Sequence, residues 1–466
     1  MMRPARPWYL AAAGVLFSLA GAADPQGRQA SAPPPVDGFS MRVVTTGLDA
    51  PWELSWGPDQ RLWVTERRGR RVLRVDPQGG ARSEALFLAE AHQSVTQDGL
   101  LGLTFHPDLL RGTGSDFVYV AFTYDDAPGP DLARRMAVRR YRYDAATQRL
   151  VEPRDLLLGL PVHDDHVAGR LAVGPDRALY LSIGDGGANF GANRCRANQA
   201  QRLPTAAEVT ARDWTAYQGK ILRIGLDGGI PADNPMFGGV RSHVYSYGHR
   251  NPQGLVFGPG GRLYESEHGP NTDDEVNLIE GGGNYGWPRV AGYRDDKVYA
   301  YANWSASAPA PCASLPTGRG GATPPPSVPV QQEATFTDAA FRPPLQTFFT
   351  VEPGVDTRLG ATIAPGSIEI VTGGPSGWGT SLLVPSMLRG LVYRLALSPD
   401  GRTVTGAPVE VFKTTNRYRD LAVSQDQRTI FVATDPDGRS TDASGRPTRD
   451  LAHPGAILAF TYTGAR

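Results

Sequence analysis

A short turn-and-strand unit recurs along most of this chain of 466 residues. Each copy places a turn rich in Gly, Pro or Asp before an apolar run, a pattern that favours a tight turn followed by a β-strand. Four such turns occupy residues 56–59, 173–176, 257–260 and 423–426. Further apolar runs follow at residues 72–75, 221–224, 392–395 and 457–460. Strands therefore dominate the predicted structure.

One such unit cannot bury its faces alone, so the copies must stack. Spacings of roughly 50 to 85 residues with long insertions predict an all-β fold, a six-bladed β-propeller of four-stranded antiparallel sheets with long loops. A pair of β-sandwiches is the alternative. With 55 Gly and 40 Pro, long helices are disfavoured, because both residues destabilise helix interiors. We expect insertions 186–217, 303–333 and 352–362 to carry function.

The N-terminus has the features of an export signal. Arg3 and Arg6 precede the apolar residues 8–19, and small residues follow at 20–22. The sequence therefore predicts a cleaved signal peptide (1–23), a flexible leader (24–38), a single propeller domain (39–466) and a periplasmic or secreted protein. An N-terminal anchor is the alternative, although the apolar stretch is short for a span of about 20 residues. No later segment is apolar enough to span a membrane.

Charge and cysteine content narrow the function classes. The chain has 47 basic and 47 acidic residues without long runs of either sign, which gives no support for a nucleic-acid surface. Cys195 and Cys312 can pair in an oxidising compartment or remain free, and the sequence leaves this open. Neither lies in a paired motif, so a zinc site built on them is not expected.

Two polar stretches suit a bound anion and a calcium ion. In residues 246–254, Arg250 and Asn251 suit a ligand with carbonyl or anionic groups, whereas a buried strand end with a satisfied arginine is the alternative. Residues 267–277 are rich in carboxylates and amides, which calcium prefers, although their spacing is not that of an EF-hand. A solvated acidic turn is the alternative for the second stretch.

Two further groups suit catalysis and anion binding. His166, with a carboxylate to orient it, can act as a general base, although most such histidines are structural. Arg417 and Arg419 would face the same side of a strand, where an anion between them relieves their repulsion. A solvated pair is the alternative.

Taken in order, these motifs resemble those of the soluble quinoprotein glucose dehydrogenases, within the glucose/sorbosone dehydrogenase family. The most specific pieces are residues 97–102, 248–255, 267–279, 282–288 and 416–420. The resemblance covers nearly the whole mature chain. It implies a six-bladed propeller that binds pyrroloquinoline quinone (PQQ) and calcium, usually as a homodimer, and oxidises an aldose at its anomeric C1 hydroxyl to a lactone. Electrons then pass to an external acceptor.

The resemblance also implies roles for individual residues. His166 matches the general base, Asp185 the carboxylate that orients it, and Arg250 a group that polarises the quinone. The other implied cofactor contacts are Gln97, Asn251, Thr362, Arg417 and Arg419. The implied substrate contacts are Gln97 and Asp165. The implied calcium ligands are Gly269 and Pro270 at the cofactor, and Glu275, Tyr285, Ala291, Tyr293, Asp295 and Glu333 at a second site.

Three departures from the family pattern stand out. Leu388 stands where a cofactor-binding lysine is usual, Phe190 replaces a polar residue near the sugar, and the 352–362 loop is short. We expect Arg358 to compensate for the missing lysine. Two other functions are retained as alternatives: a calcium-dependent lactonase or esterase, and a binding propeller without catalysis.

Overall fold

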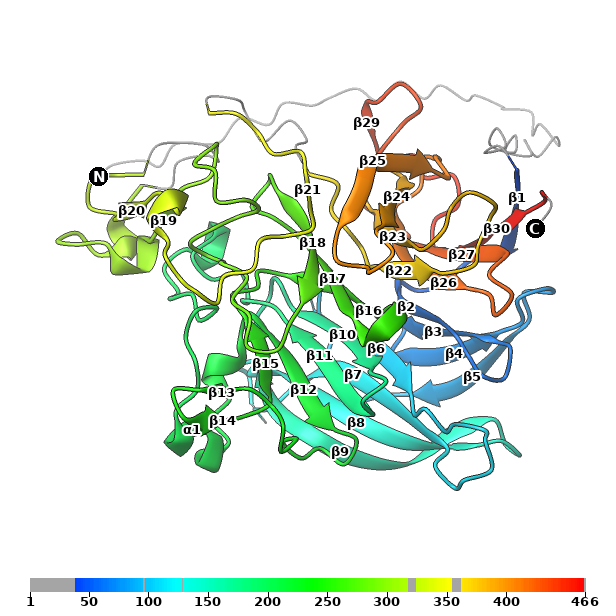
Figure 1. Cartoon of the computed structure of the whole chain (residues 1–466). Coiled ribbons are helices and arrows are strands. Elements are labelled where there is room, and N and C mark those ends of the chain that lie inside the picture. The colour runs from blue at the N-terminus through cyan, green and yellow to red at the C-terminus, as the bar shows by residue number, and fades with distance from the viewer. Residues whose placement is uncertain (1–37, 95–96, 128, 317–323, 354–361, 465–466) are drawn as a thin grey trace, which may run out of the picture. The chain divides into compact units, whose positions relative to one another are not determined.

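The computed structural model describes residues 38–94, 97–127, 129–316, 324–353 and 362–464, and Figure 1 shows their strands in chain order. Six four-stranded sheets contain most of the strand residues, and neighbouring strands within each sheet are antiparallel. The all-β, six-bladed propeller predicted from the repeats is therefore confirmed. The predicted signal peptide, nearly all of the leader and Arg358 lie outside the described residues.

The blades follow one another along the chain. The first blade contains β2 (Pro51–Trp56), β3 (Leu62–Glu66), β4 (Arg71–Val75) and β5 (Arg82–Phe87). The second contains β6 (Leu100–Phe105), β7 (Phe117–Asp125), β8 (Arg134–Asp144) and β9 (Arg149–Pro161). The third contains β10 (Ala168–Val173), β11 (Ala178–Ile183), β12 (Lys220–Gly225) and β15 (Val244–Tyr247). The fourth contains β16 (Pro252–Phe257), β17 (Leu263–Glu267), β18 (Asp274–Ile279) and β21 (Gln346–Phe348). The fifth contains β22 (Glu369–Val371), β23 (Ser381–Ser386), β24 (Leu391–Leu397) and β25 (Val404–Val411). The sixth contains β26 (Tyr418–Val423), β27 (Thr429–Thr434), β30 (Ile457–Tyr462) and β1 (Phe39–Thr45).

Short elements decorate the loops. They are three two-stranded ribbons, β13 (Met236–Phe237) with β14 (Val240–Arg241), β19 (Tyr301–Ala302) with β20 (Val330–Gln331), and β28 (Ser440–Thr441) with β29 (Pro447–Thr448); the helix α1 (Ala206–Ala211); and the 3₁₀ turns η1 (Gly191–Asn193), η2 (Thr215–Tyr217), η3 (Pro259–Gly261), η4 (Trp304–Ala306), η5 (Cys312–Ser314) and η6 (Glu333–Thr335). Among the described residues, no helix has both the length and the apolar character needed to cross a membrane.

The recurring turn is the hairpin between the first and second strands of a blade. In the first copy, Gly57 N donates to Arg61 O at 2.8 Å, and Asp59 Oδ1 accepts the Trp63 indole N–H at 3.0 Å. The Asp thus anchors the strand that follows its turn, as Asp176 does by accepting the Tyr180 hydroxyl at 2.9 Å. The later apolar runs are third strands: β4, β12, β24 and β30. Both predicted elements are confirmed.

Burial explains why second strands are so apolar. Every residue of β3, β11 and β17 is buried, since each strand packs between neighbouring blades on both faces. By contrast, the outer strands β5 and β25 are largely exposed and carry polar residues. Continuous apolar runs are typical of strands covered on both faces.

Contacts between first strands close the ring. Each of β2, β6, β10, β16 and β22 contacts the next first strand, and β26 contacts β2. A cavity of about 180 Å³ lies among these six strands. Figure 1 shows β1, at the start of the domain, beside β30, at its end. In the register of these two strands, Phe39 pairs with Tyr462. The last blade therefore joins the two ends of the domain.

The hairpins also decide where loop residues gather. Because first and second strands are antiparallel, the start of one lies beside the end of the other: Ala168 pairs with Ile183, and Tyr418 with Thr434. Residues just before a first strand and just after a second strand therefore meet at one mouth of the channel.

Candidate active site

His166 and Asp185 form a buried pair at this mouth. His166 precedes β10 and Asp185 follows β11, and His166 Nδ1 lies 2.7 Å from Asp185 Oδ1. His166 is 5% exposed and Asp185 is fully buried. Gly184 makes the close approach possible, since a Cβ there would lie 1.9 Å from the His166 carbonyl oxygen. The predicted pairing of the histidine with a carboxylate is present.

Asp185 is held as an anion by its donors. Its Oδ2 accepts the Trp287 indole N–H at 2.7 Å and the Asn198 amide at 2.9 Å. Burial opposes the charged form, but His166, Arg250 and the indole outweigh it and lower the pKa of Asp185. The anion accepts the Nδ1 proton of His166, which leaves Nε2 with its lone pair.

Polar and aromatic groups surround His166 Nε2. Asp165 Oδ2 lies 3.8 Å from Nε2, and Gln97 Nε2 donates to Asp165 Oδ1. The Phe190 ring stacks against the imidazole, with centroids 6.3 Å apart, and remains 42% exposed. The His166 imidazole thus has a polar side, formed by Asp165 and Gln97 and suited to hydroxyl groups, and an apolar side, formed by Phe190.

Arg250 and Asn251 are positioned by their backbone. Both N–H groups donate to Glu267 Oε2, at 2.6 and 3.2 Å, because Glu267 ends the strand paired with β16. The Arg250 guanidinium lies 5.2 Å from the Trp287 ring centroid and 5.6 Å from that of Phe190. Its Nη1 donates to His268 O at 3.1 Å, whereas its buried Nε has no hydrogen-bond partner among the described residues. Arg250 therefore retains a donor beside the catalytic pair.

Arg417 and Arg419 face the same side, as predicted, and the anion between them is the protein's own Asp435. Arg419 Nη2 lies 2.8 Å and Arg417 Nε 3.5 Å from Asp435 Oδ2. Both arginine side chains are mostly buried, so the solvated alternative is wrong. Burial opposes ionisation of Asp435, but the two arginines and Arg67 lower its pKa. Arg417 and Arg419 thus share one buried carboxylate, which leaves a net positive charge.

Gln253 connects this cluster to Asn251. Its Oε1 lies 3.5 Å from Arg419 Nη1, and its Nε2 donates to Asn251 Oδ1 at 2.9 Å. The cationic cluster and Asn251, a predicted cofactor contact that precedes β16, therefore belong to one buried polar network.

The predicted calcium loop is tied to the predicted cofactor residue Thr362 by Asp274. Asp274 Oδ1 accepts Gly269 N at 2.8 Å, and its Oδ2 accepts Ile363 N at 2.7 Å and the Thr362 hydroxyl. Burial raises the pKa of Asp274 to about 6. The loop of Gly269 and Pro270 is thereby fixed beside His268, whose carbonyl contacts Arg250. Their role as ligands stays a prediction.

Carboxylates of the second predicted calcium set also gather. Glu275 Oε1 accepts Gly292 N at 2.6 Å, and Glu333 Oε1 accepts Ala291 N at 2.9 Å. Burial and the negative charge of Asp295 raise the pKa of Glu333 to about 7. Tyr293 is 41% exposed. The Tyr285 hydroxyl donates to Leu278 O at 2.7 Å and accepts Glu280 N at 2.9 Å, which leaves the Tyr285 main-chain carbonyl as the candidate ligand. The set remains a prediction.

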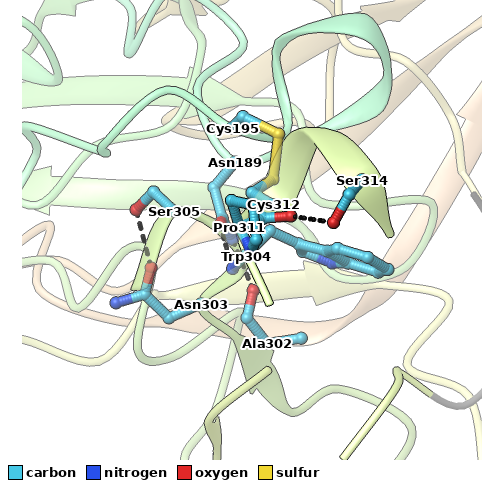
Figure 2. Close-up of a disulfide and its surroundings, with 9 residues drawn as sticks. All are labelled: Asn189, Cys195, Ala302, Asn303, Trp304, Ser305, Pro311, Cys312 and Ser314. Atoms are coloured by element: carbon cyan, nitrogen blue, oxygen red, sulfur yellow. Dashed lines mark hydrogen bonds between the residues drawn. A yellow bond between two sulfur atoms is a disulfide. The ribbon is translucent and has the colours of Figure 1, made fainter. Parts of the chain in front are cut away.

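A disulfide joins the first two insertions. Cys195 and Cys312 are bonded, which answers the question that the sequence left open, and Figure 2 shows the bond with its surroundings. Nearby, Asn189 Nδ2 donates to Ala302 O at 2.7 Å, and Asn189 Oδ1 accepts Trp304 N at 2.8 Å. The loop that carries Phe190 is therefore fastened to the 303–316 segment.

Sequence reasoning missed Asp435, Trp287 and Asn198 as site residues. A usable signal existed for Asp435, because a carboxylate ends or closely follows the second strand of five blades. These carboxylates are Glu66, Asp125, Asp185, Glu267 and Asp435. Aligning the repeats by their second strands would have placed Asp435 at the same mouth as Asp185. Trp287 and Asn198 lie in insertions and have no such repeat.

Comparisons with known proteins agree with this geometry. Residues 48–313 match the family described as Glucose / Sorbosone dehydrogenase. Quinoprotein glucose dehydrogenase B of Acinetobacter calcoaceticus is 42% identical over 442 residues, covering 91% of each chain. Aldose sugar dehydrogenase YliI of Escherichia coli is 30% identical over 254 residues, 53% of this chain and 62% of that protein. The PQQ-bound aldose sugar dehydrogenase from Streptomyces coelicolor superposes with a TM-score of 0.60 and 26% identity, covering 92% of this chain and 99% of that one.

Proposed function

Because the chain belongs to the glucose/sorbosone dehydrogenase family and is thus an oxidoreductase, we propose that it is a PQQ- and calcium-dependent aldose dehydrogenase. Its reaction is the oxidation of the anomeric C1 hydroxyl of a sugar to a lactone. The observation that carries this proposal is the buried His166–Asp185 pair, with Nε2 directed to a flank formed by Gln97 and Asp165. The lactonase alternative leaves the Arg417 and Arg419 cluster without a use.

The residues at the mouth fit a quinone that carries several carboxylates. The net positive charge around Asp435 suits such an anion, and the unpartnered Nε of Arg250 offers a donor to a carbonyl oxygen. Main-chain carbonyls of Gly269 and Pro270 are oxygen donors of the kind calcium takes. These features support Arg250, Asn251, Thr362, Arg417 and Arg419 as the residues that hold the cofactor.

When bound, the quinone supplies the acceptor for the hydride that leaves C1 of the sugar. His166 Nε2 takes the hydroxyl proton, so that C1 becomes a carbonyl carbon as C–H and O–H bonds break. Asp185 stabilises the resulting imidazolium through the 2.7 Å hydrogen bond to Nδ1. Arg250 provides positive charge and donors where negative charge develops, and Phe190 covers one face of the imidazole.

The wider proposal includes an exported homodimer that passes electrons to an external acceptor. Its support is the family relationship and, for export, the Arg3, Arg6 and 8–19 pattern. Light scattering of the mature chain tests the dimer, and N-terminal sequencing after secretion tests cleavage after residue 22 or 23.

Titration of the purified apo-protein with PQQ, in the presence and absence of calcium, tests the proposal. We expect saturable binding, followed through quinone absorbance, that is at least tenfold weaker in Arg417→Leu. Arg446→Leu is the matched control, because the Arg446 side chain is 80% exposed and, among the residues that the structure describes, pairs only with Asp442 and Ser444. Binding that is not saturable, or equal losses in both variants, would contradict the proposal.

A further inference from the structure

Three glutamates share one buried space behind the site. Glu265 and Glu267 lie two apart on β17, and the register pairs them with Asn277 and Glu275 of β18. Residues two apart on a strand face the same side, so these four side chains are brought together. Glu265, Glu267 and Glu275 are all buried, with exposed fractions of 0%, 3% and 7% in that order.

The carboxyl groups of this cluster have no basic ion-pair partner among the described residues. Asn277 Nδ2 contacts Glu265 Oε2 and Glu275 Oε2 at 3.0 Å and Glu267 Oε1 at 3.4 Å, although an amide has only two hydrogens for three carboxylates. Within the described ranges, no lysine or arginine forms an ion pair with any of the three. The neighbouring buried Lys220 donates three hydrogen bonds from its Nζ to main-chain carbonyls, at 2.8 to 3.0 Å.

A buried imidazole completes the group. His249 is fully buried, its ring stacks on Tyr285 with centroids 4.7 Å apart, and its Nδ1 lies 3.4 Å from Glu267 Oε1. Its Nε2 lies 2.9 Å from Ser246 Oγ, and donation of Nε2–H to this oxygen leaves the Nδ1 lone pair facing the glutamates.

Two buried oxygens in this group lack partners. Glu265 Oε1 and Asn277 Oδ1 have no hydrogen-bond donor among the residues that the structure describes. An unpartnered buried acceptor is costly, and a cation removes that cost. His249, Glu265 and Glu267 each offer one ligand atom within 4.8 Å of the others.

We infer that His249 Nδ1 and the carboxylates of Glu265 and Glu267 bind one divalent transition-metal ion of the Zn²⁺ type. Mixed imidazole and carboxylate ligands suit such an ion, whereas calcium takes oxygen ligands. The site differs from the predicted calcium sets, which contain no imidazole. Glu267 also accepts the Arg250 and Asn251 N–H groups, so the ion fixes the strand end that carries both residues.

Metal analysis of the full chain tests this site. The protein is stripped with a chelator, saturated with calcium to fill oxygen-ligand sites, exposed to Zn²⁺ and desalted. We expect wild type to retain about one more equivalent of zinc per chain than Glu265→Gln. Glu369→Gln is the matched control, because it removes a carboxylate from the central channel on β22, and it should retain as much zinc as wild type.

Thermal unfolding separates a lost site from a lost fold. Metal-free Glu265→Gln should melt no lower than metal-free wild type, because one of three crowded carboxylates becomes a neutral amide. Added Zn²⁺ should raise the melting temperature of wild type and Glu369→Gln but not of Glu265→Gln. Equal zinc retention in wild type and Glu265→Gln, or no retention in wild type, would overturn the inference and leave protons as the partners of these carboxylates.

Discussion

Replacing Asp185 with Asn tests the orientation of the base without changing the size of the side chain. Asp185 accepts four N–H donors, from His166 at 2.7 Å, Gly187 at 2.8 Å, Trp287 at 2.7 Å and Asn198 at 2.9 Å. An amide offers only one oxygen, so its NH₂ group must face two of these donors. The Gly187 and Trp287 N–H groups are fixed donors, and the Asn198 amide is held in its orientation by Ala200 N, which donates to its Oδ1 at 2.8 Å. His166 can answer by moving its proton from Nδ1 to Nε2, which removes the lone pair that accepts the substrate proton.

The expected loss follows from the base that is lost. General base catalysis contributes about 10²- to 10⁴-fold, so Asp185→Asn should lower kcat/KM by about 10³-fold, or about 4 kcal/mol. Dye-linked sugar oxidation, normalised to bound quinone, measures this. Asn198→Ala is the control, because it removes one donor to Asp185 and keeps the charge and the tautomer; we expect at most about a tenfold loss. Activity of Asp185→Asn within tenfold of wild type would refute the reasoning.

Three other predictions follow from the structure. Burial raises the pKa of Glu369 to about 8 and also raises that of Glu53, so the folded protein favours the protonated form of both groups. The stability that this provides is fully present below about pH 4.5 and should be lost as the pH rises through 8. The melting temperature should therefore fall over this range, and it should fall less in Glu369→Gln. The Cys195–Cys312 bond joins residues 117 positions apart in the sequence, so it restricts the unfolded chain. The variant with both cysteines changed to Ser should lose up to about 5 kcal/mol of unfolding free energy, measured by urea denaturation. An unchanged urea midpoint would contradict this. Phe190→Ala should raise the sugar KM roughly 2- to 10-fold at constant quinone affinity, and a parallel change in both would count against a sugar contact.

Local patterns predicted the blades because the information is local. The turn Asp at position 59 fixes its own hairpin through Trp63, four residues away, so turn chemistry and apolar runs sufficed. The closing pair β1 with β30 was not predicted, because it joins Phe39 to Tyr462 and depends on the ring as a whole. Long-range pairing of this kind leaves no mark in a short window of sequence.

The site was predicted to different depths for the same reason. Spacing placed Arg417 and Arg419 on one side, but their partner Asp435 directly follows the neighbouring strand β27. His166 was identified by a nearby carboxylate, whereas Trp287, which holds Asp185 from an insertion, had no periodic signal. Cofactor and substrate came from the family resemblance, because no local pattern specifies a quinone.

The most direct test of the central claim is sugar-dependent dye reduction by the protein reconstituted with PQQ and calcium, measured for wild type and His166→Gln. We predict that wild type oxidises one or more aldoses to lactones, and that His166→Gln binds the quinone with similar affinity but turns over at least 10²-fold more slowly. Turnover that survives in His166→Gln, or tight quinone binding by wild type with no aldose oxidised, would contradict the account.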